Sequence, residues 1–153
     1  MKLYTIGFKK RSAMDFFTAL KDAEVQKLID VRRKNNSLFS GFTKKADLKF
    51  FLEKCFGISY EHISEFAPSE TLLNNYKKQL GNKKYDKYAW DDYIAVFSRE
   101  VLTKAIIERF KESASNFDSL CLLCAEEKPD YCHRRLLAEY FKRHIPSITI
   151  IHL

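Results

Sequence analysis

The sequence predicts an α/β fold, a three-layer sandwich around a Rossmann-like, mostly parallel sheet of about five strands. Short β-prone runs alternate with segments of helical periodicity along the chain, which is typical of parallel βαβ units. The run from Leu120 to Cys124 has no polar position, as expected of a central strand covered by helices on both faces. Because the 153 residues include only 4 Gly and 3 Pro, no flexible linker is expected, and residues 1–153 are predicted to form a single domain.

Three of the expected strands alternate with two helices in the first half of the chain. The first helix begins at Ser12, a typical N-cap residue that is followed by Asp15 at the position of a capping partner. The second helix begins near Asp47 and ends at Gly57, the residue type that most often follows a helix. The strands are the β-prone runs 3–6, 27–32 and 58–63.

The middle of the chain is expected to be helical until the apolar run of the central strand. A helix over residues 68–79 is followed by one long helix over residues 90–110, whose apolar side chains recur at helical spacing. After the central strand and a loop, a helix over about residues 132–144 ends before Pro146. Residues 148–151 are the fifth strand.

The net charge of +7 lies entirely in the first part of the chain. Residues 1–60 contain 13 Lys or Arg and 6 Asp or Glu, whereas residues 61–153 contain 14 of each. A concentrated positive charge is typical of proteins with an anionic partner, so we expect an anionic ligand such as a nucleic acid, a nucleotide or phosphate. The sequence leaves the oligomeric state open.

The chain carries no signal for a membrane or for export. No apolar run approaches the roughly 20 residues of a membrane span, so no membrane partner is expected. Residues 1–7 lack the apolar run and the small-residue cleavage site of a signal peptide, which predicts a cytoplasmic protein. Because the cytoplasm is reducing, the 4 cysteines are expected to be free thiols rather than disulfides.

Ligands of open α/β sheets bind beyond the carboxyl ends of the strands, where this sequence has its polar loops. Asp30 and Arg32 lie on one face at the end of the second strand. They form either a structural ion pair or a binding site in which Asp30 orients Arg32 toward an anion. Tyr60 and His62 share a face at the end of the third strand. The residues expected to bind the ligand are Gly7, Lys10, Arg11, Asp30, Arg32, Tyr60, His62 and Arg134.

The loop after the central strand carries the strongest candidates for catalysis. A thiol between a buried strand and a helix N-terminus, near Arg134, is expected to have a lowered pKa and to favour the nucleophilic thiolate. Glu126 would act as a base or hold Arg134, and His133 would transfer a proton. The simpler alternative is that the cysteines only pack in the core. The expected catalytic residues are Cys124, Glu126, Cys132 and His133.

Two other uses of the cysteines compete with this interpretation. Cys121 and Cys124 have CxxC spacing, but redox pairs lie where a helix begins, and positions i and i+3 of a strand face opposite ways. The soft ligands suited to zinc are Cys124, Cys132, His133 and His62. Adjacent residues such as Cys132 and His133 rarely ligate one ion together, however, and we therefore expect no metal and no cofactor, with a zinc-containing protein as a third possibility.

Several short motifs together resemble the domain-of-unknown-function 488 family over essentially the full chain. The most specific is the pair Cys124-Ala125-Glu126 and Cys132-His133-Arg134. The resemblance implies the fold predicted above and supplies no reaction, because that family is uncharacterised. The other motifs are Thr5-Ile6-Gly7, Asp30-Val31-Arg32, Phe39 to Phe42, Tyr60-Glu61-His62 and Ile151-His152-Leu153.

The predicted architecture is also similar to that of rhodanese-type sulfurtransferases and related phosphatases, which hold an anion in a short cysteine-to-arginine loop. Cys124 precedes Arg134 by 10 residues, which is longer than such a loop, and Cys132 precedes it by only 2. The likeness is therefore one of architecture, and architecture alone does not establish function.

Two classes of function follow from these observations. In the first, the protein is an enzyme that acts on a phosphate-bearing or nucleic-acid substrate with Cys, Glu, His and Arg side chains, and a rhodanese-like thiol enzyme is an alternative to it. In the second, it is a non-catalytic module that binds nucleic acid through its basic half, and the cysteine loop braces the fold. The sequence leaves open whether the chain is catalytic.

Overall fold

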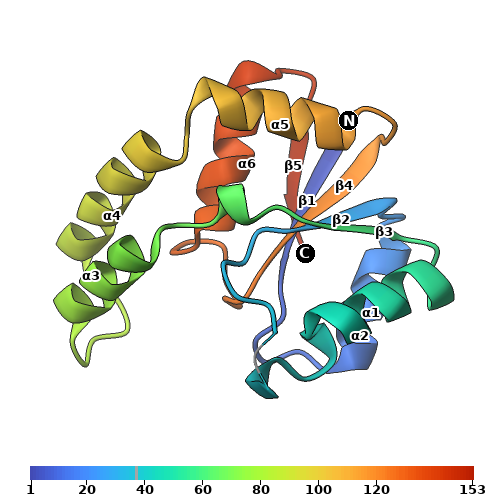
Figure 1. Cartoon of the computed structure of the whole chain (residues 1–153), viewed down its shortest axis with the longest axis horizontal. Helices are drawn as coiled ribbons and strands as arrows, with labels where there is room; N and C mark the ends of the chain where they lie inside the picture. Colours follow the sequence, from blue (N-terminus) through green and yellow to red (C-terminus); the bar gives the residue numbers. More distant parts are fainter. Residues whose placement is uncertain (37) are drawn as a thin grey trace.

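Five parallel strands form one sheet, in the order β3-β2-β4-β1-β5, in the computed structural model, which describes residues 1–36 and 38–153 (Figure 1). Every strand pairing within these residues is parallel, which confirms the predicted α/β class. Ser37 and the side chains of residues 38–40, which include the ring of Phe39, lie outside the described part. The strands are β1 (Lys2–Gly7), β2 (Lys27–Asp30), β3 (Ser59–His62), β4 (Ser119–Cys124) and β5 (Thr149–His152).

Helices cover both faces of the sheet (Figure 1). One face is covered by α1 (Ala13–Asp22), α2 (Lys45–Phe50) and the π-helix η2 (Phe51–Cys55). The other face is covered by α5 (Lys104–Ala114) and α6 (His133–His144), and beside them α3 (Glu70–Leu80) and α4 (Lys87–Glu100) form a projecting hairpin. The 3-10 helices η1 (Leu38–Thr43) and η3 (Ser64–Phe66) follow β2 and β3. None of the helices in the described part is long and apolar enough to cross a membrane.

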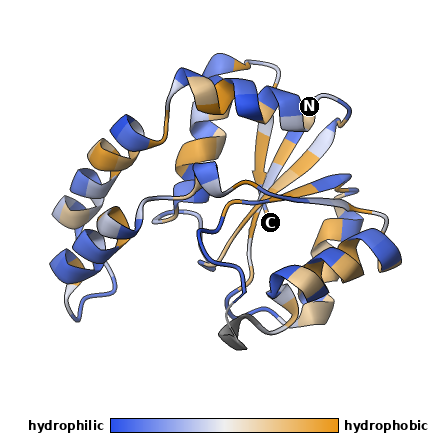
Figure 2. Ribbon diagram, in the orientation of Figure 1, coloured by the Kyte–Doolittle hydropathy of each residue, from blue (hydrophilic) through white to orange (hydrophobic). Residues whose placement is uncertain are grey.

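The central strand β4 separates two hydrophobic cores. Its six residues are all buried. Leu120, Leu122 and Cys124 face the core under α5 and α6, whereas Cys121 and Leu123 face the core under α1 and α2. Figure 2 shows mainly apolar residues in the central strands and an alternation of hydrophilic and apolar residues along the helices. The two cysteines with CxxC spacing therefore point to opposite sides of the sheet, as predicted.

The prediction of one long helix over residues 90–110 is wrong. The segment forms two helices, α4 and α5, because the chain is extended at Thr103 (φ −111°, ψ 169°). Both helices bury their apolar faces in the same core, so the helical spacing of apolar residues continues across the break. The break lets α4 pair with α3 while α5 lies over the sheet (Figure 1).

The loops that follow β1, β2 and β4 leave the sheet at one edge, because the strands are parallel. Backbone hydrogen bonds join these loops to one another. The N–H of Lys9 donates to the carbonyl oxygen of Ala125 (3.0 Å), and the N–H of Val31 donates to that of Leu123 (3.0 Å). The edge therefore holds the basic loop after β1, the end of β2 and the cysteine loop side by side.

Candidate functional site

Two cysteines and a histidine meet at the end of the central strand, on the α6 side of the sheet. The Sγ atoms of Cys124 and Cys132 and a ring nitrogen of His133 all lie within 4.8 Å of one another. The Sγ atom of Cys124 is 3.7 Å from Nδ1 of His133. The three side chains are buried, with exposed fractions of 5%, 2% and 8%. We call Cys124, Cys132 and His133 the cysteine–histidine cluster.

Local structure explains how these side chains converge although a loop separates them. Cys124 is the last residue of β4, and the alternation of the strand turns its side chain toward α6. Cys132 is the N-cap of α6 and has an extended backbone (φ −132°, ψ 135°), and His133 is the first helical residue. The change from extended to helical backbone between these neighbours directs both side chains toward Cys124.

The ring of His133 is held in one orientation by the neighbouring strand. Its Nε2 atom lies 2.9 Å from the carbonyl oxygen of Val31, the residue that follows β2. A carbonyl oxygen only accepts hydrogen bonds, so Nε2 carries the proton and donates. In the neutral ring, the free lone pair is then on Nδ1, the nitrogen closest to the sulfur of Cys124.

The two thiols of the cluster are not equivalent. A hydrogen bond from Cys132 lowers the pKa of Cys124 despite its burial, and the N–H groups that follow in the loop act in the same direction. Burial and the same hydrogen bond raise the pKa of Cys132 well above its ordinary value. The proton of the pair therefore stays on Cys132, and Cys124 is the thiol that ionises first.

Arg134 holds the loop between the two cysteines in place. Its side chain is fully buried, and Nη1 and Nη2 donate to the carbonyl oxygens of Glu126 (2.5 Å) and Glu127 (3.0 Å). The guanidinium group therefore binds the backbone of the loop, where the sequence predicts contact with a ligand.

The loop after β1 packs against the cysteine loop. Gly7 lies directly against the carbonyl group of Glu126. At the surface, Nζ of Lys9 is 2.6 Å from the carboxylate of Glu126, and Nζ of Lys10 is 2.7 Å from that of Glu127. The carboxylate of Glu126 is therefore directed to Lys9, and it is not part of the cysteine–histidine cluster.

Asp30 and Arg32 form a buried ion pair at the end of β2. The guanidinium binds both carboxylate oxygens, through Nε (2.8 Å) and Nη2 (2.7 Å), and also donates to the carbonyl oxygen of Thr43 (2.8 Å). The hydroxyl of Tyr60 (2.8 Å) and the amide of Asn35 (3.2 Å) donate to the same carboxylate. Burial raises the pKa of Asp30, but Arg32 and the other donors lower it below its ordinary value. The pair orders the loop after β2 as a structural ion pair would.

The other predicted residues lie near this ion pair or at the surface. Nε2 of His62 is 2.7 Å from the carbonyl oxygen of Arg32, so His62 also holds the loop after β2. Arg11 is half-buried and immediately precedes Ser12, the N-cap of α1. The structure thus brings the predicted residues together in two networks. One contains Asp30, Arg32, Tyr60 and His62, and the other contains Cys124, Cys132 and His133. Gly7 and Arg134 contact the cysteine loop, and Lys10 and Glu126 lie at the surface.

Most of the chain matches one known family. The family described as domain of unknown function DUF488 matches residues 12–141. The chain belongs to the domain-of-unknown-function 488 family. The matched residues include the whole cysteine–histidine cluster and the buried Asp30–Arg32 ion pair. No curated protein and no solved structure matches the chain.

In this member of the domain-of-unknown-function 488 family, the predicted site residues omit two side chains of the Asp30–Arg32 network and Tyr93, which lies near the thiols. The amide of Asn35 donates to Asp30, and the hydroxyl of Thr43 accepts from Arg32 (3.2 Å). Asn35 lies in an irregular segment and Thr43 ends the 3-10 helix η1, and neither has a sequence pattern that would indicate its role. Tyr93 of α4 is only 3% exposed, and burial and the two nearby thiols raise its pKa. Its place on the apolar face of α4 is the signal that indicates its burial.

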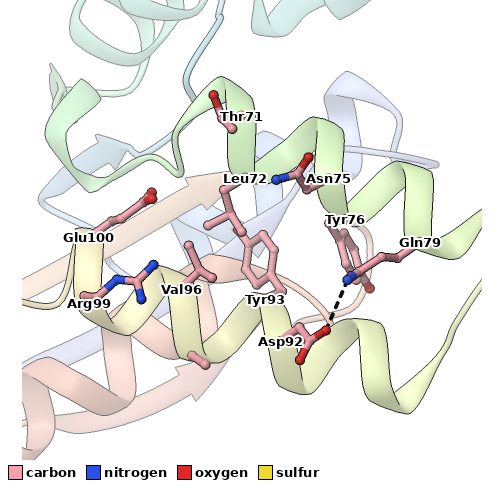
Figure 3. Close-up of a pocket in the computed structure, with 11 residues that line it drawn as sticks. Thr71, Leu72, Asn75, Tyr76, Gln79, Asp92, Tyr93, Val96, Arg99 and Glu100 are labelled. Carbon is pink, nitrogen blue, oxygen red and sulfur yellow. Dashed lines mark hydrogen bonds between the residues drawn. The ribbon is translucent and has the colours of Figure 1, made fainter.

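Tyr93 also lines a groove of about 370 Å³ between α3 and α4 (Figure 3). At one end of this groove, the amide of Gln79 donates to the carboxylate of Asp92 (3.1 Å). Trp90 stacks on Tyr93 at 4.9 Å and meets the ring of Tyr131 edge-on at 5.6 Å. In this family member, aromatic rings therefore continue from the neighbourhood of the thiols to the surface loop that carries Tyr131.

Proposed function

We propose that the protein is an enzyme whose reacting groups are the cysteine–histidine cluster and whose substrate is an anion that carries phosphate. The observation that carries the proposal is the convergence of two thiols and an imidazole at the carboxyl end of the central strand. Ligands of parallel α/β sheets bind at this edge. Thiols and imidazoles are also the groups that act as nucleophiles and proton carriers in enzymes.

Packing alone is a weaker account of the cluster. A buried cysteine is a common small core residue, and Cys121 in the opposite core is an example. His133 is different, because a buried imidazole has two polar nitrogens that need partners. Nε2 donates to the carbonyl oxygen of Val31, and the sulfur of Cys124 lies beside the ring, 3.7 Å from Nδ1 and 3.9 Å from Nε2. A base that neighbours a thiol in this way is the arrangement that activates a nucleophile.

The charge of the chain supports an anionic substrate. The excess of +7 lies in residues 1–60, and the loop with Lys9 and Lys10 packs against the cysteine loop. The ion pairs of these lysines with two glutamates are solvent-exposed, and exposed pairs contribute only about 0–1 kcal/mol each. A phosphate group can therefore replace the glutamates at little cost. Arg32 and Arg134 position the loops, because their guanidinium groups bind protein oxygens.

Turnover by the purified chain tests the cluster. The panel consists of phosphomonoesters, phosphodiesters, nucleotides, and single-stranded DNA and RNA. We expect turnover of one of these classes by the wild type and by the control Cys55→Ser, which changes an exposed cysteine. Cys124→Ser, Cys132→Ser and His133→Gln should each lower kcat by at least about 100-fold, while circular dichroism shows that they remain folded.

The substrate class has a separate readout. Replacing Lys9 and Lys10 by Gln should raise KM while kcat changes by less than about threefold, because the lysines bind the substrate and take no part in the chemistry. Wild-type turnover that persists in Cys124→Ser and His133→Gln would contradict the role of the cluster. Turnover of uncharged substrates only would contradict the anionic class.

A second function, the binding of single-stranded nucleic acid without catalysis, is favoured by one surface feature. The rings of Tyr85 and Tyr131 stack at 4.1 Å and are 41% and 42% exposed. Stacking of an unpaired base on such a ring contributes about 1–3 kcal/mol. If this is the function, Tyr131→Ala should weaken binding of single-stranded DNA by about tenfold or more, and Cys124→Ser should leave binding unchanged. If the protein is instead the enzyme proposed above, Cys124→Ser should have a larger effect than Tyr131→Ala, measured on turnover.

A further inference from the structure

We propose that the cysteine–histidine cluster binds one divalent ion of the zinc type through Sγ of Cys124, Sγ of Cys132 and Nδ1 of His133, with a fourth coordination position left for water or a substrate oxygen. The inference rests on the proposed function and changes the part that the cluster plays in it: the three side chains hold the ion, and the ion with its fourth ligand is the reacting group. The sequence alone argues against a metal, since adjacent residues rarely share an ion. The extended backbone of Cys132 at the N-cap removes that objection, because the side chains of Cys132 and His133 both turn toward Cys124.

The separations of the ligand atoms fit a tetrahedral site. Zinc binds thiolate sulfur at about 2.3 Å and imidazole nitrogen at about 2.0–2.1 Å, so a tetrahedral angle separates the two ligand atoms by roughly 3.6 Å. The Sγ atom of Cys124 is 3.7 Å from Nδ1 of His133. The two Sγ atoms and one ring nitrogen of His133 all lie within 4.8 Å of one another. The sulfur of Cys124 is nearly equidistant from Nδ1 (3.7 Å) and Nε2 (3.9 Å), so the Cys124 side chain must rotate before one ion can bind both residues.

The hydrogen bond between His133 and Val31 prepares the imidazole as a ligand. Histidines that bind metals commonly donate their other ring nitrogen to a carbonyl or carboxylate oxygen, which determines the tautomer and the plane of the ring. Nε2 of His133 makes this bond to the carbonyl oxygen of Val31 over 2.9 Å. The lone pair of Nδ1 is then available to an ion.

The chemistry of the ligands indicates the ion. Two sulfur atoms and one imidazole nitrogen suit zinc and similar transition metals, whereas magnesium and calcium take oxygen ligands. The cluster is also shielded by apolar groups, among them the ring of Phe97, whose centroid is 5.9 Å from that of His133. Burial among apolar groups favours a charge-neutralised set of two thiolates and a divalent cation over free thiolates.

The described part of the chain supplies three ligands to this site. No further Cys, His, Asp or Glu of residues 1–36 and 38–153 joins the cluster. Structural zinc sites are closed by four protein ligands, whereas catalytic sites keep one position for water or substrate. A zinc ion with an open position polarises a phosphoryl oxygen or lowers the pKa of its bound water. Both effects suit the phosphate-bearing substrate proposed above.

The metal content of the full chain tests the site. The protein is expressed without a polyhistidine tag in zinc-supplemented medium and purified under reducing conditions. Elemental mass spectrometry should find about one zinc per chain in the wild type and in the controls Cys121→Ala and His144→Gln. Cys124→Ser, Cys132→Ser and His133→Gln should each retain less than about 0.2 zinc per chain.

Cobalt makes the test independent of how the variants fold. Wild-type protein that has been treated with a chelator and titrated with Co²⁺ should develop the visible bands of tetrahedral cobalt and a sulfur-to-cobalt charge-transfer band, both saturating at about one equivalent. Wild-type protein that holds less than about 0.2 metal per chain and gives no such spectrum would overturn the inference. A disulfide between Cys124 and Cys132 in the reduced preparation would also overturn it.

These experiments distinguish the absence of the metal site from the absence of the proposed enzymatic activity. Loss of turnover in Cys124→Ser, when the active wild type contains no metal, would overturn the metal site and leave a thiol enzyme. One zinc per chain, together with no turnover of any substrate in the panel, would support the metal site and contradict the enzyme.

Discussion

A Cβ atom on Gly7 would lie 1.7 Å from the carbonyl oxygen of Glu126, so the loop after β1 and the cysteine loop meet without room for a side chain. The same carbonyl oxygen accepts a hydrogen bond from the fully buried Arg134 (2.5 Å). Gly7 also pairs with Cys124 in the register of β1 and β4. The close approach at Gly7 therefore helps to determine where the cysteine loop, and with it the cluster, is held.

Gly7→Ala is expected to lower the free energy of unfolding by about 3 kcal/mol and Tm by roughly 10 °C, because the added methyl group must displace a backbone carbonyl. Gly57→Ala is the control, since its Cβ meets no atom within 4 Å and its cost comes only from a positive φ of 67°. That cost is about 1 kcal/mol. Thermal unfolding followed by circular dichroism measures both, and equal shifts would contradict the close contact at Gly7.

Asp30→Asn is expected to lower the free energy of unfolding by about 3 kcal/mol, because it leaves the guanidinium of Arg32 buried without its counter-charge. The two side chains are only 0% and 5% exposed. The control is Glu70→Gln, which removes an exposed ion pair with Lys34 and should change stability by less than about 0.5 kcal/mol. Urea unfolding compares the variants, and similar effects would mean that the buried pair contributes no more to the free energy of unfolding than a surface pair does.

Glu61 should contribute to the acid sensitivity of the fold. Partial burial opposes its ionisation, but hydrogen bonds from Lys27, Ser113 and Arg109 lower its pKa to about 2 from an ordinary value of 4.5. A carboxyl group with a lowered pKa contributes stability that is complete above its unfolded pKa and is lost as the pH falls through its folded pKa. The stability difference between wild type and Glu61→Gln should therefore shrink from about pH 4.5 to about pH 2. Urea unfolding across this range measures it, and a difference that is constant with pH would contradict the prediction.

Thiol reactivity should separate Cys55 from the other cysteines. Cys55 is exposed, whereas Cys121, Cys124 and Cys132 are buried. Because access limits the reaction of a thiol, about one thiol per chain should react rapidly with Ellman's reagent in the native protein, and about four should react in guanidinium chloride. Cys55→Ser should abolish the rapid phase. Rapid reaction of three thiols in the native protein would show that the cluster is open to solvent.

Local pattern was sufficient where the partners are close in sequence. The cap of α1 is an example, since the N–H of Asp15 donates to Oγ of Ser12 at 3.0 Å, as predicted. The apolar run of β4 is another, because its alternation sends Cys121 and Cys124 to opposite cores. The break at Thr103 could not be predicted, because apolar spacing reports which side chains are buried and is the same in one helix or two.

By itself, the sequence determined the α/β class, the family, and the three side chains of the cluster as candidates for chemistry. Only the tertiary structure decided which candidates meet. His133 is oriented by Val31, 102 positions away, and Glu126 pairs with Lys9, 117 positions away, outside the cluster. Partners this far apart are selected by the register of the parallel strands and by packing at the sheet edge, and no local spacing of residues encodes them.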